Sequence, residues 1–411
     1  MRCIKRIVLL FFLVLFARPL GLYSSEKDPR SAIADIINSI LEEKNEEKKQ
    51  EYIKKLRSYS PDDVSSRWLA TLDSAWRVAV KVQIIDVLSE YNDKRFVIPM
   101  ANYLIDPHFV IRKAAAQTLK KIGDDRLYPV ILKIANSSNP VHRIYFIEAM
   151  NYLYDRRFYA FLTNMLRDEN KSVRIYVLNC LKVNRIGESL GLVRNAALHD
   201  KNDEVRIAAI EALGAFRDIG AIPLLHIILN DKNRDVRRES AKSLSMIGSA
   251  ASANFLSLRL LAEDDNEIKE LLIEALVLIK RVGDVRGVEK ILLTDGSTGF
   301  RIKSAYILGF SGTYAAQAAL LQALNDPDYR VRAEVCNSLG NYRNRQALAS
   351  LLEVLGREEG VYVKSAALYA VKRMNDKYSL PGLFDLYARE HDPVFKELLQ
   401  EAVREYIKRY L

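Results

Sequence analysis

The sequence predicts an all-α fold, an α-solenoid in which about eleven helical hairpins stack into a right-handed superhelix. Three observations support this fold class. A basic residue returns every 31 or 32 positions through most of the chain, an apolar residue stands seven positions after each of them, and a small residue stands six positions after most of them. A period of this length indicates one helical unit that buries its apolar face against the next copy. The basic residues of this column are Lys81, Arg112, Arg143, Arg174, Arg206, Arg237, Lys269, Arg301, Arg332, Lys364 and Lys396.

The second helix of each unit is the clearest element. Apolar residues stand one position before the basic residue, except at His142, and seven positions after it, and most residues three and four positions after it are apolar as well. Together with position ten, these positions form one face of an amphipathic helix. In the unit of Arg206 they include Val205, Ile210 and Leu213. Small residues such as Ala212 allow neighbouring helices to approach closely. Glycines late in this helix or just after it are expected to end it with a positive φ, and they are Gly123, Gly214, Gly248, Gly309 and Gly340.

The first helix of each unit is less regular and ends in a turn rich in Asp and Asn. The oxygens of these turn side chains can cap the next helix. Residues 295–299, Asp-Gly-Ser-Thr-Gly, are interpreted as a lengthened form of this turn, since they lack the Gly-Lys-Ser/Thr ending of a nucleotide-binding loop. The predicted first helices include residues 95–104, 127–135, 157–166, 221–229, 317–324 and 347–355.

Acidic residues close to the basic column predict a ladder of ion pairs along the stack. Asp203 precedes Arg206 and Asp235 precedes Arg237, so a turn carboxylate can meet the cation of its own or the next unit. Cations held in this way are structural, whereas a phosphate-binding stripe needs basic residues without local acidic partners. The predicted ladder contains Arg112, Arg143, Arg174, Arg206, Arg237, Arg301 and Arg332.

Residues 203–214, with the sequence Asp-Glu-Val-Arg-Ile-Ala-Ala-Ile-Glu-Ala-Leu-Gly, closely resemble the HEAT repeat. Residues 235–244 and 329–340 carry the same pattern, and the short period resembles the variety named for phycobilisome lyases. The resemblance covers residues 61–411 and implies the solenoid fold. It also implies an interaction scaffold as the commoner role, because only a minority of the family are enzymes. Residues 26–60 are interpreted as divergent N-terminal capping helices with a polar outer side.

Residues 1–25 form a separate segment. Arg2, Lys5 and Arg6 precede the apolar run 7–16, which fits a signal peptide or N-terminal anchor and is too short for a normal membrane span. The sequence therefore predicts an exported protein in a bacterial periplasm or cell envelope, with no other membrane-spanning segment. Without residues 1–25 the formal charge falls from +10 to +6, which gives no support for a nucleic-acid partner.

The chain carries no residue pattern typical of a catalytic or metal site. Its five histidines are scattered over five units and none is followed by Glu, whereas the deoxyhypusine hydroxylases, which are HEAT-like enzymes, hold a di-iron centre with His-Glu pairs. Cys180 and Cys336 lie five repeats apart at inward-facing helix positions, so we expect two buried thiols and no disulfide between them. No catalytic residue, metal ligand or cofactor is predicted.

The exposed side of the second helices is the predicted binding surface, because these helices generally line the concave face of such a solenoid. Tyrosines at outward positions are typical of interaction anchors. The hypothesis is a non-enzymatic scaffold that binds a protein or peptide there. The alternatives are a structural component of an envelope assembly and a lyase or hydrolase with a groove pocket, and the oligomeric state stays open. The candidate binding residues are Tyr145, Glu148, Tyr152, Tyr176, Asn179, Tyr306 and Tyr369.

Overall fold

The computed structural model describes residues 28–410, apart from residues 76, 92 and 154. In this part of the chain every regular element is an α-helix or a short 3-10 helix, and there is no strand, so the predicted all-α solenoid is confirmed. The predicted signal or anchor, residues 1–25, lies outside the described residues. The chain divides into two compact units, the first ending at Ser137 (unit 1) and the second beginning at Ser138 (unit 2).

Unit 1 begins, in its described part, with two helices in the region predicted to cap the stack. Ile33, Ile37 and Ile40 of α2 are spaced by three or four residues and are buried, as one apolar helix face requires. The carboxylate of Asp28 caps α2, and the side chain of Asn45 caps α3. The helices are α2 (Pro29–Glu42), α3 (Glu46–Leu56), α4 (Pro61–Ser74), α5 (Val78–Tyr91), η1 (Lys94–Phe96), α6 (Val97–Asn102), η2 (Tyr103–Ile105), α7 (Phe109–Ile122) and α8 (Leu127–Ala135).

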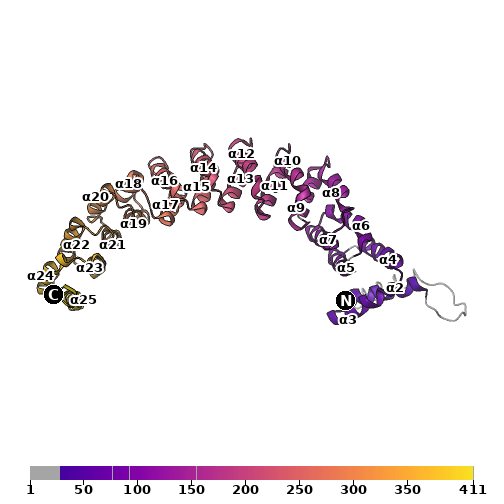
Figure 1. Ribbon diagram of the computed structural model, residues 1–411, viewed down its shortest axis with the longest axis horizontal. Helices are drawn as coiled ribbons and strands as arrows, with labels where there is room; N and C mark the ends of the chain where they lie inside the picture. Colours follow the sequence, from indigo (N-terminus) through magenta and orange to yellow (C-terminus); the bar gives the residue numbers. More distant parts are fainter. Residues whose placement is uncertain (1–27, 76, 92, 154, 411) are drawn as a thin grey trace, which may run out of the picture. The chain divides into compact units, whose positions relative to one another are not determined.

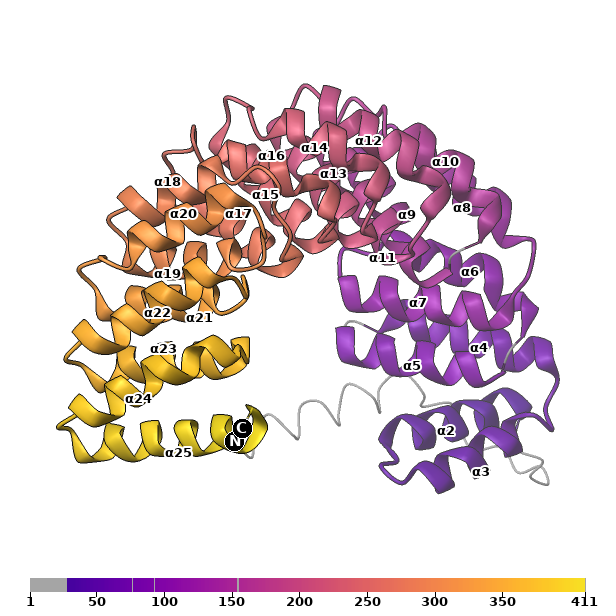
Figure 2. The same cartoon turned by 60° about the vertical axis from the view of Figure 1, so that its left-hand side comes forward.

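Unit 2 is a stack of helices in two rows that follow an arc, as Figures 1 and 2 show. The odd-numbered helices form the inner row and carry the basic column, and the even-numbered helices form the outer row. The inner row is α9 (Pro140–Leu153), α11 (Lys171–Val183), α13 (Asp203–Phe216), α15 (Arg234–Ile247), α17 (Asn266–Ile279), α19 (Thr298–Leu308), α21 (Tyr329–Leu339), α23 (Val361–Met374) and α25 (Pro393–Tyr410). The outer row is α10 (Tyr159–Met165), α12 (Leu190–His199), α14 (Ile222–Ile228), α16 (Ala253–Arg259), α18 (Arg286–Thr294), α20 (Tyr314–Ala323), α22 (Arg345–Arg357) and α24 (Leu380–Arg389).

The outer helices differ in detail from the predicted first helices. Several of them follow a single 3-10 turn, namely η3 (Arg156–Phe158), η4 (Gly187–Ser189), η5 (Ile219–Ala221), η6 (Ala250–Ser252) and η7 (Lys377–Ser379). The helix expected at residues 317–324 begins at Tyr314, because the hydroxyl of Thr313 accepts a hydrogen bond from the Ala316 amide and caps it there. The prediction that residues 295–299 form a lengthened turn is wrong. The turn before α19 has three residues, 295–297, like the turn 200–202 before α13.

The core of unit 2 follows the repeat register. In α13, Val205, Ala209, Ile210 and Leu213 are completely buried, and these residues stand one before, three after, four after and seven after Arg206. One apolar stripe on each inner helix is therefore shared with the neighbouring helices. This stripe supplies the hydrophobic stabilisation of the stack.

The glycine prediction holds at some positions and is wrong at others. Gly123 and Gly248 have positive φ and end their helices. Gly214 lies inside α13, and Gly309 and Gly340 have ordinary helical φ values of −57° and −58°. A Cβ at Gly214 would lie 2.6 Å from the Ser243 hydroxyl of α15, so the absence of a side chain allows two inner helices to touch.

Gly287 of α18 allows the closest approach in the outer row. A Cβ built there would lie 1.6 Å from the backbone carbonyl oxygen of Ser257, at the end of α16. We expect Gly287→Ala to lower the free energy of unfolding by about 2–3 kcal/mol, because a helix backbone must move to admit the methyl group. Urea unfolding followed by circular dichroism measures this change. Gly191→Ala is the control, since no atom lies within 4 Å of its added Cβ, and a loss there of more than about 1 kcal/mol would contradict this explanation.

The His226 ring predicts a pH dependence of stability. It stacks on Phe255 with ring centroids 4.0 Å apart, and its buried Nε2 atom has no hydrogen-bond partner among the described residues. Burial lowers the pKa of His226 from its ordinary value of 6.5. The unfolded chain therefore binds a proton at His226 more tightly than the folded chain does. The contribution of the neutral buried ring to the free energy of unfolding is complete above pH 6.5 and is lost as the pH falls through the lowered pKa. We expect His226→Phe, which keeps the stacked ring, to lose less stability than wild type between pH 7.5 and pH 5 in urea unfolding. Parallel losses in both proteins would exclude this histidine as the cause.

Candidate functional site

Most cations of the basic column in unit 2 form a ladder, in which the basic side chain binds a carboxylate at the turn before the next inner helix. The Nε atom of Arg174 lies 2.7 Å from Asp200 Oδ2, and its Nη2 atom lies 2.9 Å from Oδ1. Arg143 binds Asp168 in the same bidentate way, at 2.7 and 2.8 Å. Bidentate pairs of this kind are among the strongest side-chain hydrogen bonds. The pairs Arg206–Asp231, Arg301–Asp326, Arg332–Glu358 and Lys364–Glu390 continue the ladder.

The Arg174 rung also fixes the backbone of two turns. The Nη1 atom of Arg174 donates to the carbonyl oxygens of Asp168 and Glu169, at 2.6 and 3.3 Å, in its own unit. The carboxylate of Asp200 in turn accepts a hydrogen bond from the backbone amide of Asn202, with 2.9 Å between Oδ1 and the amide nitrogen. The rung thus connects the turn before one inner helix with the turn before the next.

The partners of the ladder differ in part from those predicted. Arg206 does contact Asp203 of its own unit, at 2.8 Å. Asp235, by contrast, lies near Arg234 and Arg238, at 3.6 and 3.9 Å, and the carboxylate at Arg237 is Glu263. The main partner belongs to the following unit, as in the pairs Arg143–Asp168 and Arg174–Asp200, because stacking brings the next turn over the basic residue. In unit 1, Arg112 donates to the carbonyl oxygens of Asp106 and Pro107, at 2.9 and 3.0 Å.

The ladder is weakest in the middle of unit 2. The Nε atom of Arg237 lies 3.5 Å from Glu263 Oε2, and Lys269 Nζ lies 3.7 Å from Asp295. Glu263 binds Arg259 instead, at 2.6 Å. The buried Nε atom of Arg237 is left without a hydrogen-bond partner among the described residues. Two successive interfaces therefore have looser rungs than those on either side.

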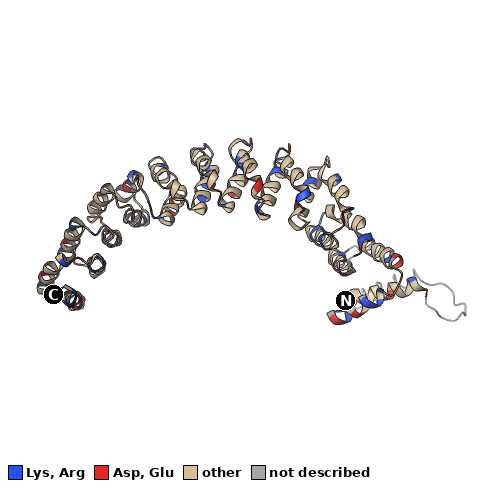
Figure 3. Ribbon diagram, in the orientation of Figure 1, with Lys and Arg blue, Asp and Glu red and all other residues tan. Residues whose placement is uncertain are grey.

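The ladder is an internal device and not a binding stripe. Arg143 and Arg174 are 9% and 4% exposed, so an outside anion can reach them only by breaking a rung. Figure 3 shows basic and acidic residues interspersed along the inner and outer rows of unit 2. The strongest cation column of the sequence is consequently not the functional surface.

Five of the candidate binding residues lie on two adjacent helices of the inner row, α9 and α11. The ring of Tyr145 stacks near His142, with centroids 6.4 Å apart, and the side chain of Tyr176 is 40% exposed. The Asn184 side-chain amide donates to Asn151 Oδ1 at 3.1 Å and connects the two helix ends. This group, which we call the tyrosine patch, consists of Tyr145, Glu148, Tyr152, Tyr176 and Asn179.

Tyr306 and Tyr369 are not part of that patch. Tyr306 lies on α19 and packs edge-to-face against Phe310, with ring centroids 5.0 Å apart. Tyr369 lies on α23, is 60% exposed, and is 5.7 Å from the Arg373 guanidinium. Helix α21 lies between α19 and α23 in the inner row, so Tyr306 and Tyr369 are not neighbours. The shared position within the repeat does not bring the candidate residues of different units into one site.

Two further columns of exposed residues were not predicted. Nine positions after the basic column, four units carry an exposed apolar side chain at or just beyond the end of the inner helix. Eleven positions after the basic column, the backbone turns to positive φ. Both columns have the period of the basic column. The first could have been found in the sequence as apolar residues that recur nine positions after the basic residue, outside the predicted buried face. The residues of the first column are Val183, Met246, Leu278 and Phe310.

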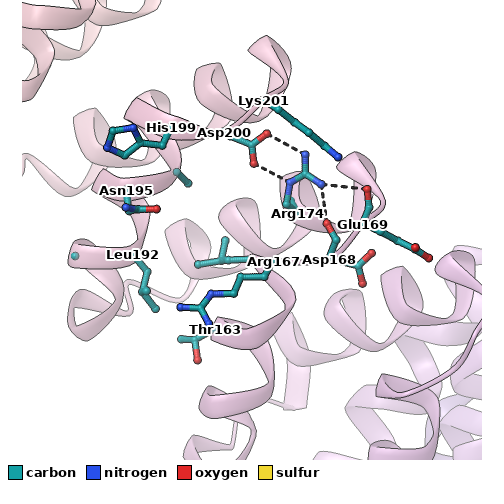
Figure 4. Close-up of a pocket in the computed structure, with 13 residues that line it drawn as sticks. Thr163, Arg167, Asp168, Glu169, Arg174, Leu192, Asn195, His199, Asp200 and Lys201 are labelled. Atoms are coloured by element: carbon teal, nitrogen blue, oxygen red, sulfur yellow. Dashed lines mark hydrogen bonds and ion pairs between the residues drawn. The ribbon is translucent and has the colours of Figure 1, made fainter.

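A groove of about 590 Å³ lies beside α12 in the outer row (Figure 4). Arg167, Leu192, Asn195 and His199 line it, and the Arg174–Asp200 rung lies at its edge. A second groove, of about 500 Å³, lies in the equivalent place beside α24. The groove recurs where the units stack, so it is a consequence of the repeat.

The described residues contain no group of three or more His, Cys, Asp or Glu side chains that could hold a metal ion. Cys180 and Cys336 are buried free thiols, as expected from their inward positions. Burial raises the pKa of each thiol to about 12, which keeps both in the unreactive protonated form. Among the described helices, none has the length and apolar character needed to cross a bilayer.

The sequence of the chain matches a description of HEAT repeats at residues 192–277, 285–372 and 318–404, which together span half of the chain. The deoxyhypusine hydroxylase of Arabidopsis thaliana is 28% identical over 200 residues, covering 39% of this chain and 63% of that relative. The bilin biosynthesis protein PecE of Mastigocladus laminosus is 27% identical over 107 residues, covering 24% of this chain and 40% of that relative. The matched part is thus less than two thirds of either relative.

Among solved structures, a mutant of Kap121p is similar with a TM-score of 0.58 and 13% identity, covering 94% of this chain and 50% of that chain. Kap121p bound to RanGTP and Kap121p bound to Nup53p each have a TM-score of 0.55 and 13% identity, covering 93% of this chain and 49% of theirs. At this identity the likeness concerns the fold alone.

Proposed function

This chain belongs to the HEAT-repeat family, and on that premise we propose that it is a non-enzymatic scaffold that binds a protein or peptide partner on the inner row of unit 2. The observation that carries this proposal is the tyrosine patch. Tyrosines stand two positions after the basic residue in both α9 and α11, and polar Glu148 and Asn179 stand three positions further along. Tyrosine supplies a large contact area at a small cost in side-chain entropy and is enriched at binding hot spots.

The wider family supports a binding role. The similar Kap121p has been solved with RanGTP and with Nup53p, both of which are proteins. The similarity to a hydroxylase and to a bilin biosynthesis protein concerns a minority of this chain. An assay for bound iron and zinc on the purified protein separates the roles, since a stoichiometric metal would favour an enzyme over a scaffold.

The proposed location of this scaffold is the bacterial cell envelope, after export. The support is the basic and apolar character of residues 1–16, which fits a signal or anchor. Cell fractionation of the native host tests it, and recovery of the chain only in the cytosol would exclude export.

The tyrosine patch is tested by affinity capture from envelope extract with wild type and with Tyr145→Ala/Tyr176→Ala. We expect the double variant to recover at least tenfold less of one specific partner, because two aromatic anchors of one patch are lost. Tyr314→Ala is the matched control, since Tyr314 is 79% exposed on α20 in the outer row. Equal recovery by wild type and the double variant would remove the patch from the proposal. Isolation of the chain only as a fixed part of a large assembly would favour a structural component.

A further inference from the structure

A column of positive-φ residues runs along unit 2, eleven positions after the basic column. Each member directly follows an inner helix or lies a few residues beyond it. From Arg185 to Asn375 its spacing is again that of the basic column. The column consists of Arg185, Arg217, Gly248, Lys280, Gly312, Arg343 and Asn375, with φ between 46° and 68°.

The residue types in this column are not explained by backbone conformation. The left-handed region suits glycine, and Asn tolerates it, but a residue with a long side chain is strained there. Gly248, Gly312 and Asn375 fit this expectation. Arginine or lysine stands at the other four positions, which we call the basic row: Arg185, Arg217, Lys280 and Arg343. A strained residue that persists in the same register four times points to a use for its side chain.

The basic row is accessible and free of acidic partners. All four side chains belong to exposed residues, and no carboxylate of the described chain lies within ion-pair distance of them. The ammonium group of Lys280 lies over the rings of Tyr306 and Phe310 in the next unit, 5.9 and 5.6 Å from their centroids. These cations therefore contrast with the buried ladder, whose charges are already paired.

Exposed apolar residues accompany the positive-φ column in four units, two of which also carry a member of the basic row. Two positions before the positive-φ column, Val183 is 63% exposed, Met246 40%, Leu278 64% and Phe310 41%. We call these four residues the apolar stripe. Exposed apolar side chains that recur at the same position of several units favour an interaction surface, since a helix end that faces only water needs no apolar residue there. The stripe has members at the ends of α11, α15, α17 and α19, and the basic row has members at the ends of α11, α13, α17 and α21.

We propose that the apolar stripe and the basic row form a second docking surface, which binds an extended, acidic segment of another protein. This inference rests on the proposed role as a protein-binding scaffold but uses other residues than the tyrosine patch. Inner helices pack about 10 Å apart. An extended chain in the polyproline II conformation advances about 3.1 Å per residue with about three residues per turn, so every third side chain faces the same way. A bound segment therefore passes about three residues per unit. The matching segment carries an apolar residue at every third position, which contacts the stripe, and Asp or Glu between them, which face the basic row.

The test uses the full chain and fluorescein-labelled peptides of fifteen residues. The repeat Leu-Asp-Glu matches both columns, Ser-Asp-Glu lacks the apolar residue, and Leu-Ser-Gln lacks the charge. By fluorescence anisotropy we expect the first peptide to bind at least tenfold more tightly than the other two, and to weaken several-fold between 50 and 200 mM NaCl because the charges are exposed. Absence of binding by the Leu-Asp-Glu peptide would overturn the proposal.

The decisive variant replaces Arg185, Arg217, Lys280 and Arg343 by glycine. Glycine already occupies this register at Gly248 and Gly312, so we expect an unchanged or higher thermal midpoint and at least a tenfold loss of affinity for the Leu-Asp-Glu peptide. Leu278→Ser/Phe310→Ser is expected to lose affinity with little change in its salt dependence. Wild-type affinity in the glycine variant would overturn the basic row as a binding element.

Two comparisons separate this surface from other possibilities. Tyr145→Ala/Tyr176→Ala is expected to bind the peptide like wild type, so the second surface can stand even if the tyrosine patch fails. An equal loss in that variant would overturn the assignment of two surfaces. Phosphatidylglycerol vesicles and poly(U) RNA serve as competing polyanions. If either binds through the basic row and the Leu-Asp-Glu peptide does not, the partner is a membrane or a nucleic acid and the peptide proposal is wrong.

Discussion

Replacement of Leu213 by Asp is expected to lower the free energy of unfolding of unit 2 by about 4–5 kcal/mol. Leu213 is completely buried in α13, seven positions after Arg206. The substitution removes apolar contacts and places a carboxylate in the core, on the helix face that buries Ile210 and Ala209, where leaving a charge unpaired is costly. Because each unit contacts only its neighbours, the loss should also divide the cooperative unfolding of the stack at this point.

Urea unfolding, followed by circular dichroism, measures this effect. The matched control is Leu278→Asp, the same substitution at a position that is 64% exposed, and there we expect a change within about 1 kcal/mol. The Leu278 variant also lies in the apolar stripe, so it separates a loss of binding from a loss of stability. A change below about 1 kcal/mol for Leu213→Asp would mean that the repeat register is wrong.

The second large effect is expected at the ladder. Arg174→Ala should cost about 3–4 kcal/mol, because it leaves the Asp200 carboxylate without its bidentate partner. The carbonyl oxygens of Asp168 and Glu169 also lose the donor that closes their turn. Arg174 is 4% exposed, so water cannot fully replace these bonds.

A double-mutant cycle tests whether the rung is the cause. Arg174→Ala/Asp200→Ala should be less destabilised than the sum of its two single variants, since removal of both partners leaves no unpaired charge. Arg156→Ala is the control, because its ion pair with Glu188 is exposed at both ends and should contribute less than about 0.5 kcal/mol. Strict additivity of the two single variants would show that the pair does not act as a unit.

The repeat is the part of the structure that the sequence predicts best. The basic and apolar columns predicted the helical units and the buried helix face that contains Val205 and Leu213. Both features depend only on the spacing of residues along one helix. The residues that pair across units were harder to identify. Asp203 stands three positions before Arg206, yet the ladder partner Asp231 comes from the following turn, whose place is set by stacking.

The remaining features depend on backbone conformation and on contacts between units. Gly214 looks like a helix end in the sequence, but it lies where α13 touches Ser243 of α15. Arg217 and Lys280 give no sequence signal for positive φ, since that conformation is usual for glycine and uncommon for long side chains. Of the candidate binding residues, five lie on α9 and α11, whereas Tyr306 and Tyr369 lie on other helices.

The loose rungs at Arg237 and Lys269 have a mechanical consequence. When unit 2 is pulled from its two ends, tension passes from one inner helix to the next across the interfaces that the rungs brace. The short bidentate bridges at Arg174 and Arg301 resist this load, whereas the gaps of 3.5 and 3.7 Å at the middle yield earlier. We therefore expect unit 2 to bend more easily between α15 and α19 than on either side, so that a bound partner changes its curvature there at the smallest cost in free energy.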